Sequence, residues 1–222
     1  MKRFFHNELE DLRGRILLMG ERALDQVVLA FSALEERDVT KIEAVLKQDD
    51  RIDELEMEID NEVIRYISLR APVATELRLL TTSMKVAHDL ERVGDEACTI
   101  VKRARDLIEE EHSLPLLELA RMNRLATRLL RDAMDAFLNE DFAKATELPR
   151  HDKEIDDINR GHFRDYQNLV QEDDLSVETA FSLVFISKAL ERIGDHATNL
   201  AEAVVFMYRG EDIRHSDLTK RK

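Results

Sequence analysis

Apolar residues recur at every third or fourth position over most of the chain. Between residues 4 and 36 these positions are Leu9, Leu12, Ile16, Met19, Ala23, Val27, Phe31 and Leu34. Because an α-helix has 3.6 residues per turn, this spacing places an apolar stripe along one face of a long amphipathic helix. The same periodicity predicts five more helices, over residues 40–69, 75–110, 116–139, 141–171 and 176–208.

Short polar stretches and prolines separate these predicted helices. Arg37 and Asp38 divide the first from the second, and Pro72 ends the second because the residue before a proline disfavours the α conformation. Thr75 is the predicted cap of the third helix. Pro149 falls inside the fifth helix, which it should kink or interrupt.

The order of three helices, a linker and three helices indicates an internal duplication. The phrase Leu-Glu-Arg-Val/Ile-Gly-Asp occupies residues 90–95 and again residues 190–195. The duplication predicts two domains, residues 1–112 and 113–222, joined by an acidic linker at residues 109–113. Earlier in each half, identical residues lie 103 positions apart: Ala30 and Ala133, Ala33 and Ala136, Asp38 and Asp141, Lys41 and Lys144, Asp49 and Asp152, Ile52 and Ile155, Asp53 and Asp156.

Composition supports a helical fold. The 222 residues include only six glycines, three prolines and no tryptophan, and 36% of them are charged, which favours long helices over short strands joined by turns. We expect an all-α protein made of two tandem three-helix bundles related by a pseudo-twofold axis. The two halves could alternatively pair end to end.

Charge and cysteine content indicate the cellular compartment and the classes of partner that the chain is expected to bind. With 33 basic and 47 acidic residues the net charge is −14, which disfavours binding to nucleic acid or anionic lipid. The single cysteine, Cys98, cannot form an internal disulfide. No apolar run approaches the ~20 residues that span a bilayer, and the polar residues soon after Met1 leave no room for a signal peptide. We therefore expect a cytoplasmic protein that does not insert into membranes.

The duplicated phrase carries two carboxylates four residues apart. Glu91 and Asp95 form this pair in the first half, and Glu191 and Asp195 form it in the second. On a helix this spacing places both groups on one face, about 5–6 Å apart at Cβ, where like charges repel. A bound cation is the obvious way to offset that repulsion.

A second acidic pair lies on the preceding helix of each half. Asp49 and Asp53 form it in the first half, and Asp152 and Asp156 in the second. If the two helices of a half bring these faces together, four carboxylates converge. Such oxygen ligands suit Mg²⁺, Mn²⁺, Ca²⁺ or iron.

The acidic pairs could instead have a purely structural role, without any bound metal. Glu56 and Asp60 have the same spacing without any duplicated context, and Arg92 and Arg192 could simply pair with the neighbouring acids. Glycine inside a helix costs about 1 kcal/mol relative to alanine. Its presence in both copies, at residues 94 and 194, suggests that another backbone or a ligand approaches closely there.

Three histidines lie near the acidic pairs: His88, His151 and His196. Such histidines are more often hydrogen-bonded surface groups than ligands, and only His196, which directly follows Asp195, is singled out for testing. The chain has no P-loop, nucleophile elbow or Cys-x-x-Cys motif. Helical di-iron enzymes use Glu-x-x-His, but Glu91 and Glu191 are each followed by glycine three residues later, which argues against oxygen activation.

Taken together, these motifs resemble the PhoU family of bacterial phosphate-signalling proteins. The resemblance rests on the doubled phrase, on Asp-x-x-Ile-Asp at residues 49–53, and on Arg-Ala-Pro-Val-Ala-Thr-Glu-Leu-Arg at residues 70–78. It covers nearly the whole chain. Glu76 stands where the family often has aspartate, and the second half has Leu-Ser-Val-Glu at residues 175–178 in place of the Pro-Val-Ala segment.

The resemblance implies a cytoplasmic, often dimeric regulator. Such proteins act with the phosphate-specific ABC transporter and the sensor histidine kinase of the phosphate regulon, restraining uptake and gene expression when phosphate is plentiful. It also implies acidic motifs that hold multinuclear metal clusters, with iron in some members. Carried over by position, one site would comprise Asp49, Asp53, Glu91 and Asp95, and the other Asp152, Asp156, Glu191 and Asp195.

Three hypotheses follow. The first is a non-enzymatic, metal-binding adaptor that forms a homodimer and couples phosphate transport to signalling. The second is a carboxylate-bridged metalloenzyme or metal store. The third is a purely structural helical scaffold whose acidic pairs are satisfied by arginine.

Overall fold

All regular secondary structure in the described residues is helical. The computed structural model describes residues 2–110, 113–211 and 213. Its elements are α1 (Lys2–Glu36), α2 (Val39–Arg70), α3 (Ala74–Asp106), α4 (Leu117–Asn139), α5 (Phe142–Glu147), the 3-10 turn η1 (Leu148–Arg150), α6 (Asp152–Gln171) and α7 (Val177–Arg209).

Most helices begin and end close to their predicted limits. The Asp38 carboxylate caps α2 by accepting the Thr40 N–H at 2.8 Å. The cap of α3 differs from the prediction, because this helix begins at Ala74 and the Glu76 carboxylate accepts the Val73 N–H at 3.1 Å. The side chain three residues into the helix therefore satisfies the free N–H, and Thr75 is not the cap.

The predicted fifth helix is interrupted, as Pro149 led us to expect. The chain forms α5, then η1 around Pro149, and resumes as α6 at Asp152. Proline lacks the N–H of a helical residue and its ring clashes with the preceding turn. The interruption makes Asp152 the first residue of a new helix, whereas the matching Asp49 lies within the continuous helix α2.

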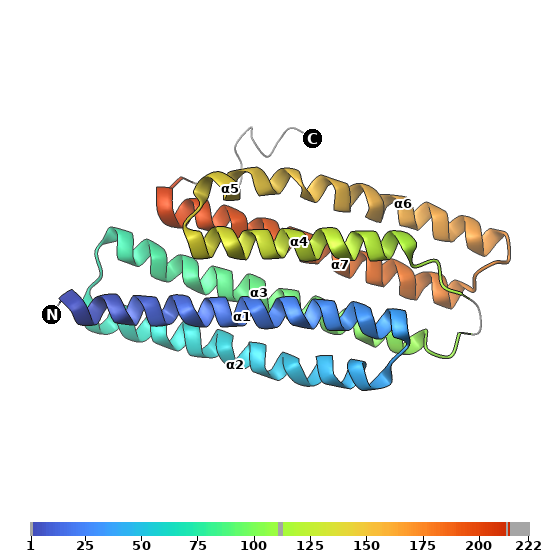
Figure 1. Ribbon diagram of the computed structural model, residues 1–222, viewed down its shortest axis with the longest axis horizontal. Coiled ribbons are helices and arrows are strands. Elements are labelled where there is room, and N and C mark those ends of the chain that lie inside the picture. Colours follow the sequence, from blue (N-terminus) through green and yellow to red (C-terminus); the bar gives the residue numbers. More distant parts are fainter. Residues whose placement is uncertain (1, 111–112, 212, 214–222) are drawn as a thin grey trace.

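The helices form two bundles that lie side by side with their long axes aligned (Figure 1). The first bundle contains α1, α2 and α3, and the second contains α4, α5 with α6, and α7. They meet along a seam where α3 packs against α7 and α1 against α4. The predicted all-α fold of two tandem bundles is confirmed, in the side-by-side rather than the end-to-end arrangement. The proposed domain boundary lies between α3 and α4, where residues 111 and 112 are outside the described residues.

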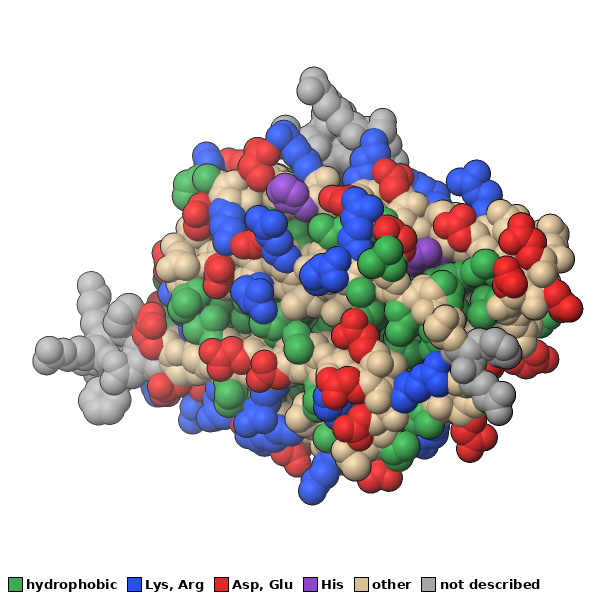
Figure 2. Space-filling view, turned by 45° about the vertical axis from the view of Figure 1, so that its right-hand side comes forward, with side chains coloured by type: hydrophobic (Ala, Val, Ile, Leu, Met, Phe, Trp, Pro, Cys, Tyr) green, Lys and Arg blue, Asp and Glu red, His purple; other side chains and the backbone are tan. Residues whose placement is uncertain are grey.

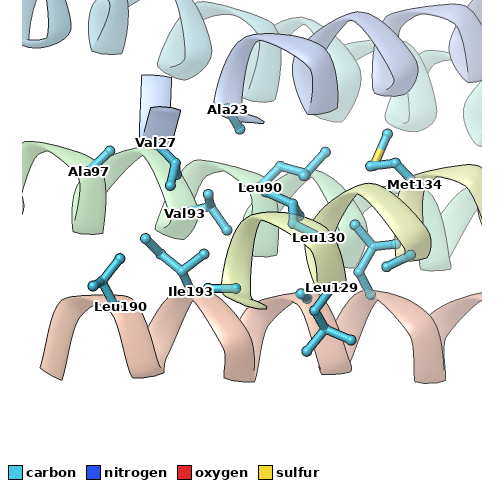
Figure 3. Close-up of a cluster of buried hydrophobic side chains, with 14 of the residues drawn as sticks. Ala23, Val27, Leu90, Val93, Ala97, Leu129, Leu130, Met134, Leu190 and Ile193 are labelled. Carbon is cyan, nitrogen blue, oxygen red and sulfur yellow. The ribbon is translucent and has the colours of Figure 1, made fainter. Parts of the chain in front are cut away.

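The apolar residues of the duplicated phrase are buried at this seam. Figure 3 shows side chains of α1, α3, α4 and α7 packed together there. Burying each such side chain contributes about 1.5–3 kcal/mol. Those drawn include Ala23, Val27, Leu90, Val93, Ala97, Leu129, Leu130, Met134, Leu190 and Ile193, nearly all of them fully buried.

The surface mixes charges of both signs. On the face shown in Figure 2, acidic and basic side chains are interspersed, and a band of hydrophobic side chains crosses its middle. Within the described residues, none of the helices combines the length and the apolar character that crossing a membrane requires.

Candidate metal centres

In the second bundle, aspartates of two helices converge. Asp152 and Asp156 project from the first turns of α6 and meet Asp195 of α7, so that one oxygen of each lies within 4.8 Å of the others. The sequence placed these three residues in one predicted site. Three carboxylates this close make an oxygen-only environment of the kind that hard cations occupy.

The charges in this cluster are poorly compensated. Burial, followed by the charges of Asp195, Asp156 and Glu191, raises the pKa of Asp152 from its usual 3.8 to about 7. Burial also raises the pKa of Asp195, with Glu191 and Asp156 adding to the effect. The Oδ1 atom of Asp152 is buried and accepts no hydrogen bond. An unsatisfied buried carboxylate oxygen is costly, so these residues fit a cation that would neutralise them.

Glu191, the fourth predicted residue, is paired differently. Lys188, one turn earlier on α7, lies with its Nζ 2.5 Å from Glu191 Oε2. Arg192 turns away from both acids of its own phrase and bonds Glu96 across the seam at 3.0 Å. Within the described part of the chain, the three clustered aspartates have no ion pair with arginine, so the arginine alternative does not account for them.

The first bundle satisfies its acids with protein groups. Arg92 lies with Nε 3.1 Å from Glu91 Oε2 and with Nη1 2.8 Å from Asp95 Oδ2. Asp49 accepts a hydrogen bond of 3.1 Å from the amide of the fully buried Gln26. The arginine alternative therefore describes Glu91 and Asp95 well.

The predicted first-half set is also more dispersed. Among the described residues, no three of Asp49, Asp53, Glu91 and Asp95 bring ligand atoms within 4.8 Å of one another. They remain close enough to interact electrostatically. Burial, then the charges of Asp49 and Asp95, raises the pKa of Asp53, and burial followed by the charge of Asp95 raises the pKa of Glu91.

The glycines of the repeated phrase, Gly94 and Gly194, do mark close approaches, but the approaching groups are side chains. A Cβ at Gly194 would lie 2.7 Å from Asp152 Oδ1 and 3.0 Å from Ile155 Cδ1. A Cβ at Gly94 would lie 3.0 Å from Gln26 Oε1 and 3.1 Å from Asp49 Oδ1. Because glycine has no side chain, α3 can approach Asp49 of α2, and α7 can approach Asp152 of α6.

The histidine singled out from sequence has another partner. His196 bonds Asp89 of α3 across the seam at 2.9 Å, and His151 is exposed and belongs to neither cluster. His88 instead lies with Glu56 and Glu91, and one potential ligand atom from each residue falls within 4.8 Å of the other two.

Sequence reasoning missed Glu56 because its spacing to Asp60 looked commonplace. Two signals could have found it. Glu56 lies two turns after Asp49 on the same helix, and His88 precedes Glu91 by three residues, so each falls on the face that carries the acidic pair.

Cys98 lies beside the hydrogen bond between Gln26 and Asp49. The thiol is buried, and the Gln26 amide nitrogen is 3.6 Å from its sulfur. Burial, followed by the charge of Asp49, raises the pKa of Cys98 to about 12. The thiol therefore stays protonated at neutral pH.

Comparison with known proteins assigns both bundles to the same kind of domain. The model of the PhoU domain matches residues 16–104 and 119–204. A Pseudomonas aeruginosa protein named phosphate-specific transport system accessory protein PhoU homolog is 36% identical over 219 residues, covering 98% of this chain and 90% of that protein. The Escherichia coli accessory protein PhoU is 30% identical over 211 residues, covering 95% and 88%.

Two solved structures align with this chain over nearly its whole length. The crystal structure of PhoU from Pseudomonas aeruginosa aligns with a TM-score of 0.89 at 35% identity, over 93% of this chain and all of that one. The phosphate transport system regulatory protein PhoU from Streptococcus pneumoniae aligns with a TM-score of 0.87 at 27% identity, over 94% and 98%.

Proposed function

Because this chain belongs to the PhoU family, we propose that it is a regulatory accessory protein of phosphate transport. The observation that carries this proposal is the match to proteins of that name over at least 95% of the chain. Both PhoU domains are included, so the resemblance extends beyond one shared module.

The finer proposal is that the protein acts in the cytoplasm as an adaptor. It restrains the phosphate-specific ABC transporter and signals to the sensor histidine kinase of the phosphate regulon when phosphate is plentiful. The relatives' names support a link to the transporter. The lack of a membrane-crossing helix in the described residues fits a protein that acts through contacts with membrane partners.

The adaptor works as a homodimer in this proposal. Three phenylalanines of the second bundle support it, because Phe163 of α6 and Phe181 and Phe185 of α7 are 64%, 60% and 45% exposed. Exposed aromatic side chains on neighbouring helices are typical of protein interfaces. A single-chain mass by sedimentation equilibrium at micromolar concentration would contradict the dimer.

Metal binding is the second part of the proposal. Asp152, Asp156, Glu191 and Asp195 hold a divalent or trivalent ion in the second bundle, supported by the clustered aspartates and the unpaired Asp152 oxygen. Asp49, Asp53, Glu91 and Asp95 are the corresponding predicted set in the first bundle. There Arg92 already contacts Glu91 and Asp95, and Gln26 already bonds Asp49, so fewer carboxylate oxygens are free to bind an ion.

A non-enzymatic role is proposed because the relatives are named as accessory and regulatory proteins. A carboxylate-bridged metalloenzyme or metal store is the rival. It predicts turnover by the metal-loaded chain or stoichiometric iron loading with redox cycling. Metal analysis combined with an activity screen separates the two, since an adaptor holds metal without turnover.

The regulatory proposal is tested by capture from membranes. The tagged chain is incubated with detergent-solubilised membranes of phosphate-replete and phosphate-starved source cells, and bound proteins are identified by mass spectrometry. We expect transporter and sensor kinase components to be enriched from replete cells. Their absence from both captures, with the chain folded by circular dichroism, would refute the adaptor role.

A further inference from the structure

We propose that the outer face of α4 is a docking surface for an acidic amphipathic helix of a partner protein. A leucine and four arginines make up this face, which we call the arginine ridge: Leu117, Arg121, Arg124, Arg128 and Arg131. The proposal rests on the charge and spacing of these side chains. It stands apart from the metal centres and from the proposed role in phosphate transport.

The spacing of the arginine ridge matches the contact face of a coiled coil. Its members follow one another at steps of four, three, four and three residues, so they lie in one line along α4. All five are exposed, because the other faces of α4 pack against α1, α6 and α7. In Figure 1, α4 runs between α1 and α6 and in front of α7, which leaves its outer face accessible to another helix.

The charge of the ridge is poorly compensated within the protein. Within the described residues, Arg124 and Arg131 form no ion pair and no side-chain hydrogen bond, and they lie about 10.5 Å apart along the helix axis. Arg128 Nε lies 3.7 Å from Asp132 Oδ2, but the Arg128 side chain is 81% exposed, and Asp132 already pairs with Lys144 at 2.8 Å. Arginines three or four positions apart on a helix repel one another. In a chain of net charge −14, the ridge is a local positive surface that a negatively charged partner would neutralise.

Ion pairs mark both ends of the uncompensated segment. Arg121 Nη2 lies 2.6 Å from Glu154 Oε1 of α6. Asp135, the next residue in the same line after Arg131, places Oδ2 3.6 Å from Lys144 Nζ. The uncompensated charge is therefore confined to the two helical turns between these pairs, a length that suits a helical segment of a partner.

A groove beside the ridge offers apolar contact as well. It has a volume of about 560 Å³ and is lined by Val28 of α1 and by residues of α4, among them Arg124, Arg128 and Arg131. Val28 is 46% exposed, and Leu117 at the start of the ridge is 78% exposed. The methylene stems of arginine also pack along apolar surface while the guanidinium groups stay in water. An amphipathic helix can contact both kinds of group, whereas a purely ionic ligand would leave the apolar side chains uncovered.

The first bundle lacks the ridge. The matching positions, 103 residues earlier on α1, are Gly14, Leu18, Glu21, Asp25 and Val28. Acids therefore replace Arg124 and Arg128, so the repeated helix does not need arginine at these positions in order to fold. In the part of the chain that the structure describes, neither acid forms an ion pair with the ridge. The positive face belongs to the second bundle alone, which directs the partner helix to α4.

The test measures binding of the full chain to a synthetic peptide by fluorescence anisotropy. The probe is a stapled, fluorescein-labelled helix with leucine and glutamate at alternating three- and four-residue steps on one face, and alanine and glutamine elsewhere. A peptide of the same composition with its glutamates on the face opposite the leucines is the control ligand. Arg124→Gln with Arg131→Gln removes the uncompensated charge. Arg105→Gln with Arg164→Gln is the matched control chain, since these arginines are exposed and lie on α3 and α6.

We expect the probe to bind the unmodified chain, with affinity at least tenfold weaker after Arg124→Gln with Arg131→Gln and within twofold for the matched control chain. Raising the salt concentration from about 50 to about 300 mM should weaken this binding, because the contacts are ionic and exposed. Arg124→Glu with Arg131→Glu should instead bind a probe that carries lysine in place of glutamate. Such an exchange of charges requires the side chains of the ridge to face the peptide directly.

Three results would overturn the docking surface. The first is a control peptide that binds as tightly as the probe, and the second is a loss of less than tenfold after Arg124→Gln with Arg131→Gln. The third is binding to phosphatidylglycerol vesicles without binding to the probe, since the ridge would then serve a lipid surface. Circular dichroism confirms that each variant is folded, and none of these measurements depends on the transporter.

Discussion

The two bundles carry the same six-residue phrase but surround it with different partners. In the first, Asp49 is bonded by Gln26, and Arg92 lies against both acids of the phrase. In the second, Leu129 stands at the position of Gln26, and Arg192 reaches Glu96 across the seam. Asp152 therefore keeps an unsatisfied oxygen and a raised pKa. Duplication preserved the helical scaffold, but the residues that face the acids determine how each pair is neutralised.

The helix break strengthens this difference. The interruption at Pro149 makes Asp152 the first residue of α6, yet none of the free backbone N–H groups there bonds its buried Oδ1. Asp49 lies in the interior of α2 and depends on a side-chain donor instead. Similar sequences thus leave Asp49 hydrogen-bonded within a helix and the matching Asp152, at a helix start, without a partner for its Oδ1.

The largest expected change in the free energy of unfolding comes from adding a side chain at Gly194, where α7 packs closely against Asp152 and Ile155. Gly194→Val would force Asp152 and Ile155 away from α7, since even a Cβ would lie 2.7 Å from Asp152 Oδ1. Overpacking of this kind destabilises proteins by about 1–3 kcal/mol, and we expect a loss near the upper end. Urea denaturation of the metal-free chain measures it.

Gly161→Val is the matched control. A Cβ there would meet only Asp165 Oδ2 at 3.9 Å, so its free energy of unfolding should change by less than about 0.5 kcal/mol. Equal losses in the two variants would show that the contact at Gly194 has no special role.

A smaller effect is expected from the pH dependence of Asp152. Its pKa is about 7 in the folded chain and near 3.8 when unfolded, so the folded state holds the proton more tightly. Stability therefore falls as pH rises from about 4 to about 7, and the full penalty remains above 7. Asp152→Asn removes the charge and should stabilise the metal-free chain by about 1–2 kcal/mol at pH 8, allowing for partial solvent screening.

Denaturation curves at pH 4 and pH 8 test this expectation. The advantage of Asp152→Asn should vanish at pH 4, and saturating Mn²⁺ at pH 8 should favour the wild-type chain. Asp157→Asn, an exposed neighbour, should show no such pattern. An advantage equal at both pH values would contradict the raised pKa.

The smallest change in stability is expected at the arginines of the phrase. Arg92→Gln removes partly exposed ion pairs to Glu91 and Asp95, which are worth about 0–1 kcal/mol. It should nevertheless strengthen binding of a divalent ion to the predicted acidic set of the first bundle, because Glu91 loses a competing cation. Arg192→Gln is the counterpart and should leave that affinity unchanged, since its partner is Glu96. Calorimetric titration of both variants makes the comparison, and equal affinities would count against competition by Arg92.

Much of the fold follows from sequence periodicity, and part of the site does as well. The helices, the break at Pro149 and the convergence of Asp152, Asp156 and Asp195 follow from local spacing and duplication. The partners of Arg92 and Arg192 do not, because identical side chains on identical motifs point in different directions once the bundles pack. His196 was favoured for its position beside Asp195, yet adjacent helical residues point about 100° apart, and His196 bonds Asp89.

Cys98 gives the first bundle a built-in reporter. It is the only thiol in the chain, and Thr198 takes its place in the second copy. A thiol that is shielded and protonated reacts with alkylating dyes only when the helices around it separate. The labelling rate of the unmodified protein therefore reads out the opening of one bundle.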